Sequence, residues 1–558
     1  MGDTHEVLNQ PPALVDYDLA AADPVLVKAL VRENGGWSTG QLSAYGRRMA
    51  SSEVYEWGFQ ANLNPPVLHT HDRFGHRLDQ VEFHPSWHSL LELAIGNGLH
   101  SLPWERPPGT GAYPARTALT FLASQIEAGH FCPISMSTSV VPTLRLQPEI
   151  AAEWEPLQLS RVYDSSFRPA AEKSGVLMGM GMTEKQGGSD VRANTTRAEA
   201  IEGGGPGGEY LLTGHKWFMS APMCDAFLVL ANAVGGLSCF LLPRFTPDGE
   251  VNRIHIQRLK DKLGNRSNAS SEVELDGAWG RMVGEEGRGV ATIIEMVSGT
   301  RLDCVTGSAA LMRQAVTQAI HHTTHRTAFG SALIDKALMR NVLADLEVET
   351  EMAVLLMMRM AGAFDRAAID EHDALIKRVL TPVAKYWVTK RCSEVVHEAT
   401  ECLGGNGFVE ESIMARLYRE SPLNAIWEGS GNVIALDLVR ALAKQPTVID
   451  ALGKELGTVQ GVDARLDNLI ESALTRARNP ADADYGARRL IELLALAIGG
   501  SLVLQHAERE VWEAFAATRL DGDWGHLYGT LPSTIDPTAI IDPAAPRFES
   551  TVTLEGGE

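Results

Sequence analysis

The hydrophobic pattern changes its period between residues 176 and 284, and this change constrains the fold more than any other feature of the chain. Apolar residues alternate with polar ones, or run together briefly, in seven segments that are joined by turns. These segments are residues 176–183, 192–201, 209–220, 226–234, 237–245, 254–260 and 271–283. Short strands that follow one another without helices between them indicate an antiparallel barrel or sandwich. We therefore expect a central β domain.

Helical periodicity flanks this central domain on both sides. Residues 86–98 and 115–129 place apolar side chains three and four positions apart, and long amphipathic runs return from about residue 287 to residue 444. The remainder has a helical pattern up to about residue 520 and ends in a tail rich in Pro and Asp, which we expect to be poorly ordered. The sequence predicts a multi-domain α+β protein. Its domains are an N-terminal helical domain (1–175), a central antiparallel β-barrel (176–284), a helical bundle (285–445) and an extra C-terminal helical domain with an acidic tail (446–558).

The chain is long enough for several hydrophobic cores, and it is strongly acidic. It has 558 residues, 44% of them hydrophobic, and its formal charge is 49 − 70 = −21. Such a charge repels nucleic acid and acidic membrane surfaces on average. There is no basic leader, no apolar run long enough to cross a membrane, and no C-x-x-C pair among the six cysteines. We expect a cytoplasmic protein that does not attach to membranes.

A histidine-rich stretch invites comparison with a metal site. The five histidines between residues 67 and 88 are His69, His71, His76, His84 and His88. Most of them fall in a Pro-containing region that we expect to be irregular, and none belongs to an H-E-x-x-H motif. We predict no metal site in this chain.

Residues 180–196 (MGMTEKQGGSDVRANTT) combine hydroxyl groups with adjacent glycines. Thr183 and Ser189 can hydrogen-bond ring edges or phosphate oxygens, and Gly187-Gly188 lets backbone N–H groups approach an anion closely. The dinucleotide fingerprint is excluded, because Glu184 stands where its third glycine belongs. A Gly-Gly flanked by Thr, Ser and Asp is most often a surface turn, so other motifs must decide between a turn and a cofactor loop.

Four later motifs favour a cofactor loop. They are KWFMS at 216–220, RTAFG at 326–330, LGGNGF at 403–408 and WEGSGN at 427–432. In this order and approximate spacing, and with MTEKQGGSD at 182–190, they resemble the acyl-CoA dehydrogenase family of flavoproteins. The sequences TEKQGGSDV at 183–191, HKWF at 215–218 and WEGSGN at 427–432 are similar to the AidB-type branch of that family. The resemblance runs from about residue 30 to residue 445.

The resemblance implies FAD as the cofactor. Phe218 and Ser220 lie two positions apart, so that a strand presents both on one face. The resemblance implies that Phe218 covers the isoalloxazine ring and that Ser220 reaches its reactive edge. Arg326 supplies a fork of donors suited to a pyrophosphate. The residues implied to bind FAD are Met180, Met182, Thr183, Gly188, Ser189, Phe218, Met219, Ser220, Arg326, Phe329, Gly404, Gly405, Asn406, Gly407, Trp427, Gly429, Ser430 and Asn432.

The same resemblance implies an oligomer. In this family the elements that correspond to Arg326 and to residues 404–407 reach the cofactor across a subunit interface, which implies a homotetramer built as a dimer of dimers. Two departures from the family concern the contacts to adenine. Glu401 and Ala337 stand where the family usually has Gln.

Glu428 is the predicted catalytic residue. Removal of a proton α to a thioester requires a carboxylate whose pKa is raised by an apolar, water-excluded site. Trp427 and Gly429 flank Glu428 and provide such a setting. Some family members carry the base on an earlier helix, immediately before an Arg, but here Thr300 occupies that position. Nitroalkane oxidases of the same fold use Asp at the later position. Both comparisons favour dehydrogenase chemistry with Glu428.

Three functions stay open at the level of sequence. The first is an FAD-dependent oxidoreductase of acyl-CoA-like substrates, with an electron-transfer flavoprotein as the partner that the resemblance implies. The second is an AidB-type DNA-alkylation-response protein that binds double-stranded DNA, and the third is a flavin-loaded scaffold. Residues 446–558 carry 9 basic and 18 acidic side chains, a net charge of −9, which disfavours DNA. Their basic side chains concentrate at Arg476, Arg478, Arg488 and Arg489.

Overall fold

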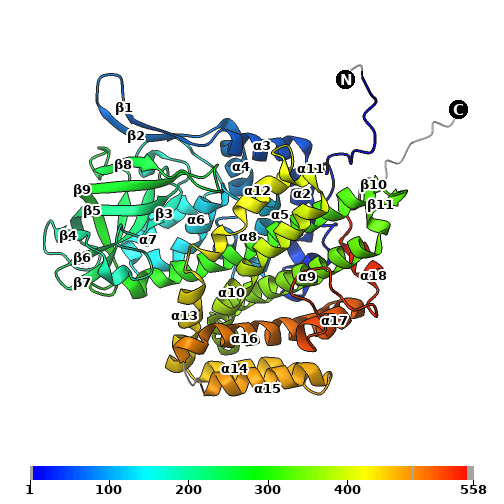
Figure 1. The fold of residues 1–558 in the computed structure, drawn as a ribbon. Helices are drawn as coiled ribbons and strands as arrows, with labels where there is room; N and C mark the ends of the chain where they lie inside the picture. The colour runs from blue at the N-terminus through cyan, green and yellow to red at the C-terminus, as the bar shows by residue number, and fades with distance from the viewer. Residues whose placement is uncertain (1–3, 480–482, 549–558) are drawn as a thin grey trace.

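The computed structural model describes residues 4–479 and 483–548. It contains a helical N-terminal domain, a β-barrel, a helical bundle and a C-terminal helical extension (Figure 1). The barrel lies at one end of the molecule, and the helices of the other parts pack together beside it (Figure 1). The structure confirms the predicted fold class. Within the described residues, no helix has the length and apolar character that a membrane crossing requires.

Two buried helices form the centre of the N-terminal domain. α5 (Ala112–Ile126) and α6 (Phe131–Leu144) both pack against the long helix α8 (Gly289–His325) of the bundle. Because α5 and α6 are surrounded in this way, nearly all of their residues are buried. The other helices of the domain are α1 (Pro24–Arg32), α2 (Thr39–Met49), α3 (Ser52–Leu63), α4 (Pro85–Gly96) and α7 (Pro148–Gln158).

The histidine-rich stretch forms a β-hairpin, and our expectation of an irregular region was wrong. β1 (Val67–His71) pairs antiparallel with β2 (Arg77–Glu82), and the hairpin projects from the body (Figure 1). The His69 ring lies 2.8 Å from the Glu82 carboxylate across the ladder, and the His76 ring lies 2.8 Å from Asp72. In the described part of the chain, no three His, Cys, Asp or Glu side chains gather as a metal site would need.

Seven strands form the central sheet. β6, β4, β5, β9 and β7 close into a ring, because β7 pairs with both β9 and β6, while β3 and β8 attach to β6 and β9. The pairs β3–β6 and β4–β6 are parallel, which corrects the prediction of a purely antiparallel barrel. The chain leaves β3 through the long loop 182–196, so a hairpin does not set its direction. The strands are β3 (Met178–Gly181), β4 (Arg197–Ala200), β5 (Glu209–Ser220), β6 (Ala226–Ala233), β7 (Gly236–Pro243), β8 (Ile254–Leu259) and β9 (Ser270–Val283).

The bundle consists of long helices whose apolar faces pack on one another. α8, α9 (Ala337–Arg366) and α10 (Glu371–Cys402) contact one another along their lengths. α12 (Ile413–Glu420) and α13 (Gly431–Lys444) then pack on α10, so the turn between them is held against the centre of the bundle.

The C-terminal extension packs on the outside of the bundle. Arg519 forms buried ion pairs with Asp345 (2.6 Å) and Glu349 (3.3 Å) of α9, and the Gly529 N–H donates to Asp345 (3.0 Å). These contacts order the segment after residue 520 as far as residue 548, which corrects our expectation of a poorly ordered tail there. Residues 549–558 lie outside the described residues. The helices are α14 (Thr447–Leu456), α15 (Ala464–Arg478), α16 (Ala483–His506), α17 (Arg509–Phe515) and α18 (Pro537–Ile541).

Candidate active site

The turn before α13 carries Glu428 in an unusual backbone conformation. Its φ is +57°, a left-handed value that is costly for a residue with a side chain. The surrounding helices hold the turn in place. Arg301 Nε donates to the Glu428 carbonyl (3.0 Å), and Lys385 Nζ donates to the carbonyl of Gly429 (2.6 Å). The Thr300 hydroxyl donates to Glu428 Oε2 at 2.8 Å, so the carboxylate is fixed against α8.

The surroundings of Glu428 make its carboxyl group a stronger base than an exposed one. Burial raises the pKa of Glu428, while the hydrogen bond from Thr300 and the charges of Arg301 and Lys385 act against that rise. A carboxylate with a raised pKa, held by one hydrogen bond, is suited to accepting a proton from a weak carbon acid.

The end of β5 presents an aromatic ring and a hydroxyl on one side. Phe218 is 49% exposed and Ser220 is half-buried, whereas Met219 between them is fully buried. The loop after β3 meets this end of the strand, because Thr183 bridges to Phe218 and the Trp217 N–H donates to the Thr183 carbonyl (2.8 Å). The structure therefore brings the first two motifs together.

A buried ion pair anchors the loop of residues 182–196 to β5. Lys216 Nζ lies 2.9 Å from Glu184, and neither side chain is accessible to solvent. Glu184 also accepts hydrogen bonds from the hydroxyl and N–H groups of Thr195 and Thr196. Glu184, which excluded the dinucleotide fingerprint in the sequence, thus closes the base of the loop.

The remaining loop residues lie at different depths. Met180 is buried within β3, so only its backbone faces the loop, and Met182 is half-buried. Gly188 packs against Thr183, since a Cβ atom on Gly188 would lie 2.4 Å from the threonine hydroxyl. Ser189 is exposed.

Cys132, a residue that sequence reasoning missed, connects the two halves of the site. Burial raises the pKa of its thiol to about 11, Lys262, Asn268 and Ser220 oppose that rise, and the charge of Glu428 adds to it. Ser220 at the end of β5 and Glu428 before α13, which belong to different domains, therefore both influence the pKa of this thiol. A single cysteine outside any motif gives no signal in the sequence that would have revealed this position.

The start of α13 is tied to the C-terminal extension. Trp427 Nε1 donates to the Asn424 side chain (2.8 Å), and Ser430 caps the helix. Asn432 in the first turn accepts a hydrogen bond from Arg488 Nε of α16 (2.8 Å). The extension therefore contacts the helix that begins just after the turn that holds Glu428.

A second group of predicted residues lies apart from the barrel. Arg326 ends α8, Phe329 lies in the turn between β10 and β11, and residues 404–407 lie at α11. These elements and the barrel occupy opposite ends of the molecule (Figure 1). One chain therefore does not bring the second group to Phe218 and Ser220. The element bounds are β10 (Thr327–Ala328), β11 (Ser331–Ala332) and α11 (Gly405–Phe408).

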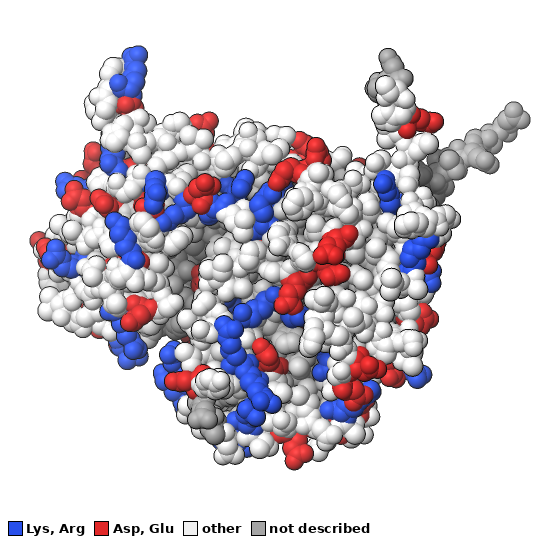
Figure 2. Space-filling model, viewed as in Figure 1, with Lys and Arg blue, Asp and Glu red and all other residues white. Residues whose placement is uncertain are grey.

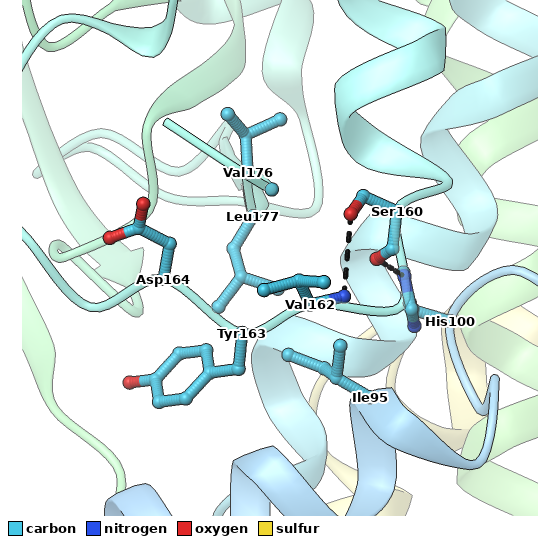
Figure 3. Close-up of a pocket in the computed structure, with 9 residues that line it drawn as sticks. Ile95, His100, Ser160, Val162, Tyr163, Asp164, Val176 and Leu177 are labelled. Carbon is cyan, nitrogen blue, oxygen red and sulfur yellow. Dashed lines mark hydrogen bonds between the residues drawn. The ribbon is translucent and has the colours of Figure 1, made fainter. Parts of the chain in front are cut away.

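A separate pocket lies where the N-terminal domain passes into the barrel (Figure 3). His100 bonds to the carbonyl of Ser160 (2.9 Å), and the Val162 N–H donates to the Ser160 hydroxyl (3.3 Å). Burial lowers the pKa of His100 to about 4, so its imidazole is neutral near pH 7. None of the predicted site residues lines this pocket. Much of its lining comes from the segment between residues 160 and 177, which joins the N-terminal domain to the barrel.

This chain belongs to the acyl-CoA dehydrogenase family. Residues 179–278 match the acyl-CoA dehydrogenase middle domain, and residues 287–443 match the acyl-CoA dehydrogenase C-terminal domain. The crystal structure of Caenorhabditis elegans ACDH-11 in complex with C11-CoA has a TM-score of 0.84 and 29% sequence identity, and the match covers 93% of each chain.

Within that family, the chain falls in the AidB branch. Residues 9–165 match the N-terminal domain of the adaptive response protein AidB. AidB of Escherichia coli (strain K12) is 45% identical over 519 residues, which are 93% of this chain and 95% of that protein. Acyl-CoA dehydrogenase family member 11 of Caenorhabditis elegans is 32% identical over 505 residues, which are 84% of this chain and 80% of that protein.

Proposed function

We propose that this chain is an FAD-dependent oxidoreductase that removes hydrogen from the α and β carbons of an acyl-CoA-like thioester. The observation that carries the proposal is the Glu428 carboxylate, whose pKa is raised by burial and which is fixed by the hydrogen bond from Thr300. The Glu428 carboxylate would take the α proton at Oε1, the oxygen that Thr300 leaves free. Membership in the acyl-CoA dehydrogenase family supports the same chemistry.

The barrel fits a flavin ring. An aromatic side chain that is 49% exposed, beside a hydroxyl on the same face of a strand, offers a flat apolar surface and a hydrogen-bonding group. Phe218 would stack on the ring, and Ser220 and Thr183 would bond its edge. Bound FAD supplies the acceptor for the β hydrogen as a hydride.

The adenosine and diphosphate half of FAD would lie on a partner subunit. Phe329 is 97% exposed and Phe408 is 83% exposed, which is unusual for large apolar side chains. A second copy that places its barrel on this surface would cover both rings and join Arg326 and residues 404–407 to the flavin site. We therefore propose a dimer that shares two FAD sites, and a homotetramer built from two such dimers.

Substitution of the base tests the proposed reaction. A general base contributes roughly a hundred- to ten-thousand-fold, so Glu428→Gln should lose that factor in the rate at which an acyl-CoA bleaches the flavin absorbance near 450 nm without oxygen. Glu471→Gln, which changes an exposed glutamate of α15, should keep the wild-type rate. Bleaching at the wild-type rate in Glu428→Gln would exclude Glu428 as the base. In a separate assay, an electron-transfer flavoprotein would be tested as the acceptor of electrons from the reduced flavin.

A second function is motivated by one feature of the surface. Lys and Arg side chains gather in a strip over the region where α10, α13 and α16 meet, with acidic side chains beside them (Figure 2). Such a strip is compatible with an AidB-type protein that protects double-stranded DNA and has only weak dehydrogenase activity. The net charge of −9 over residues 446–558 opposes tight binding. A salt-sensitive shift of duplex DNA without bleaching by any acyl-CoA would favour this alternative.

A further inference from the structure

The N-terminal segment is hydrogen-bonded to the residue predicted to hold the pyrophosphate. The Asn9 side chain pairs with Thr327: Nδ2 donates to the Thr327 carbonyl (2.8 Å), and Oδ1 accepts from its N–H (2.8 Å) and its hydroxyl (2.9 Å). Arg326 Nη1 donates to the Asn9 carbonyl. Asn9 has φ +58°, a conformation that Asn tolerates better than most residues.

The next residue reaches the glycine loop. Asn406 Nδ2 donates to Gln10 Oε1 at 3.2 Å, so adjacent residues of one segment contact both Arg326 and residues 404–407. The two prolines that follow stiffen the segment, and the Pro12 carbonyl is hydrogen-bonded to the His321 ring (2.9 Å). In Figure 1 the chain before α1 passes beside α11 and β10. The N-terminal segment thus joins two motifs that are about 80 residues apart into one surface.

We propose that Asn9 and Gln10 are part of the FAD site: Gln10 contacts the adenosine diphosphate half, and Asn9 holds Arg326 in place for the diphosphate through its backbone carbonyl. This inference rests on the proposed function, because it assumes that Arg326 and residues 404–407 bind FAD. The side-chain amide of Gln10 is exposed, and it keeps its NH₂ group for an acceptor after Oε1 has bonded to Asn406. The second lone pair of Oε1 can still accept, so the amide offers a donor and an acceptor that match the edge of adenine, which Asn and Gln recognise in pairs of hydrogen bonds.

The proposal also accounts for two departures in the sequence. The family resemblance implies Gln near the adenine at the positions where this chain has Glu401 and Ala337. Gln10 places an amide against the same loop from a different part of the chain. Asn9 has a different role, because its bond to Arg326 Nη1 fixes the guanidinium while Nε and Nη2 stay available for phosphate oxygens.

Comparison of two flavins tests the proposal, since FMN lacks the adenosine half. Full-length protein stripped of flavin would be titrated with FAD and with FMN, and binding followed by quenching of flavin fluorescence. Asn9→Ala and Gln10→Ala should each weaken FAD about tenfold, as expected for one or two lost hydrogen bonds, and leave FMN unchanged. Asn9→Asp should weaken FAD further and more strongly at low salt, because its carboxylate would face the diphosphate. Glu6→Ala, an exposed change in the same segment, should alter neither affinity.

The other outcomes separate the possible failures. Equal FAD affinities in Asn9→Ala, Gln10→Ala and wild type would overturn the proposal, and so would an equal loss for FAD and FMN, which a purely structural latch would give. Tighter FAD binding would also overturn it, because the segment would then be a plug that competes with the cofactor. If the wild-type chain bound neither flavin, the proposed function would fail and this inference with it.

Discussion

At the scale of single residues, the chemistry proposed for this site depends on how one carboxylate is held. Glu428 tolerates a left-handed backbone because Arg301 binds its own carbonyl group and Lys385 binds the next one, that of Gly429. The strain aims the side chain at α8, where Thr300 is its hydrogen-bond donor. In the sequence, Thr300 excluded a base at position 300. In the structure, the same threonine positions the Glu428 carboxylate.

Removal of the Thr300 hydroxyl should shift the pH dependence. The hydrogen bond favours the charged carboxylate, so Thr300→Val should raise the pKa of Glu428 further. Because the base must be deprotonated to act, the rising limb of kcat/KM against pH should move to higher pH by about one unit. Thr306→Val removes a hydroxyl that bonds only within α8, and its profile should match the wild type. An unmoved limb in Thr300→Val would show that the hydrogen bond does not tune the base.

The sequence could predict Glu428 but not its neighbour Cys132. Glu428 belongs to a short motif whose residues are adjacent in the chain, so the pattern is visible without a fold. Cys132 reaches the site only because α6 packs against α8 and β3, and these contacts join residues far apart in sequence. Periodicity reports the buried face of a helix, but it does not report which distant side chain lies opposite.

At the scale of elements, the barrel was the part of the fold most visible in the sequence. The predicted strand segments overlap all seven strands of the central sheet, because each strand alternates or runs apolar between clear turns. The parallel β3–β6 pair was not visible, since strand order is set by long-range pairing. The hairpin at residues 67–82 was missed because its histidines and the prolines that flank it hid a short alternation that packing does not reinforce.

A buried cluster of charges between α1, α8 and α9 should make stability depend on pH. Arg313 pairs with Asp23 (2.9 Å) and with Glu347 (2.6 Å). Burial raises the pKa of Glu351, one turn along α9, to about 8, and the charges of Glu347, Asp23 and Glu508 add to the rise against Arg313. The folded chain therefore keeps a proton that the unfolded chain releases from its ordinary pKa of 4.5 upward. Stability should fall as pH rises from that value to about 8.

Glu351→Gln should remove this loss. The variant should gain roughly 3 kcal/mol relative to wild type in the free energy of unfolding between pH 5 and pH 8, measured by urea denaturation at each pH. Glu371→Gln, an exposed change at the start of α10, should follow the wild-type pH dependence. Parallel curves for Glu351→Gln and wild type would mean that Glu351 titrates normally in the folded chain.

At the scale of the whole molecule, the proposed cofactor site is complete only in an assembly. Phe218 and Ser220 lie on β5 of the barrel and Glu428 in the turn before α13, whereas Arg326 and residues 404–407 lie at the end of α8 and at α11, near the exposed Phe329 and Phe408 side chains (Figure 1). No sequence pattern states which copy of a chain completes a site, so this division between two copies stays a prediction that the family resemblance implies. The C-terminal extension adds a further constraint, because Arg488 bonds to Asn432 in the first turn of α13, just after the turn that carries the base.

Substitution of Phe329 should separate the subunits and release the cofactor together. Burial of one phenylalanine at an interface contributes about 1.5–3 kcal/mol, and symmetry places two copies at each contact. Phe329→Ser should therefore raise the dissociation constant of the oligomer at least tenfold, seen by sedimentation velocity, and lower the flavin retained after dilution. Val234→Ser changes an equally exposed apolar side chain in the β6–β7 turn and should affect neither measurement. If Phe329→Ser lost flavin while its assembly stayed intact, Phe329 would contact the cofactor without holding the subunits. If it lost neither, the surface around Phe329 would not be where two chains meet, and the shared cofactor site would have to be abandoned.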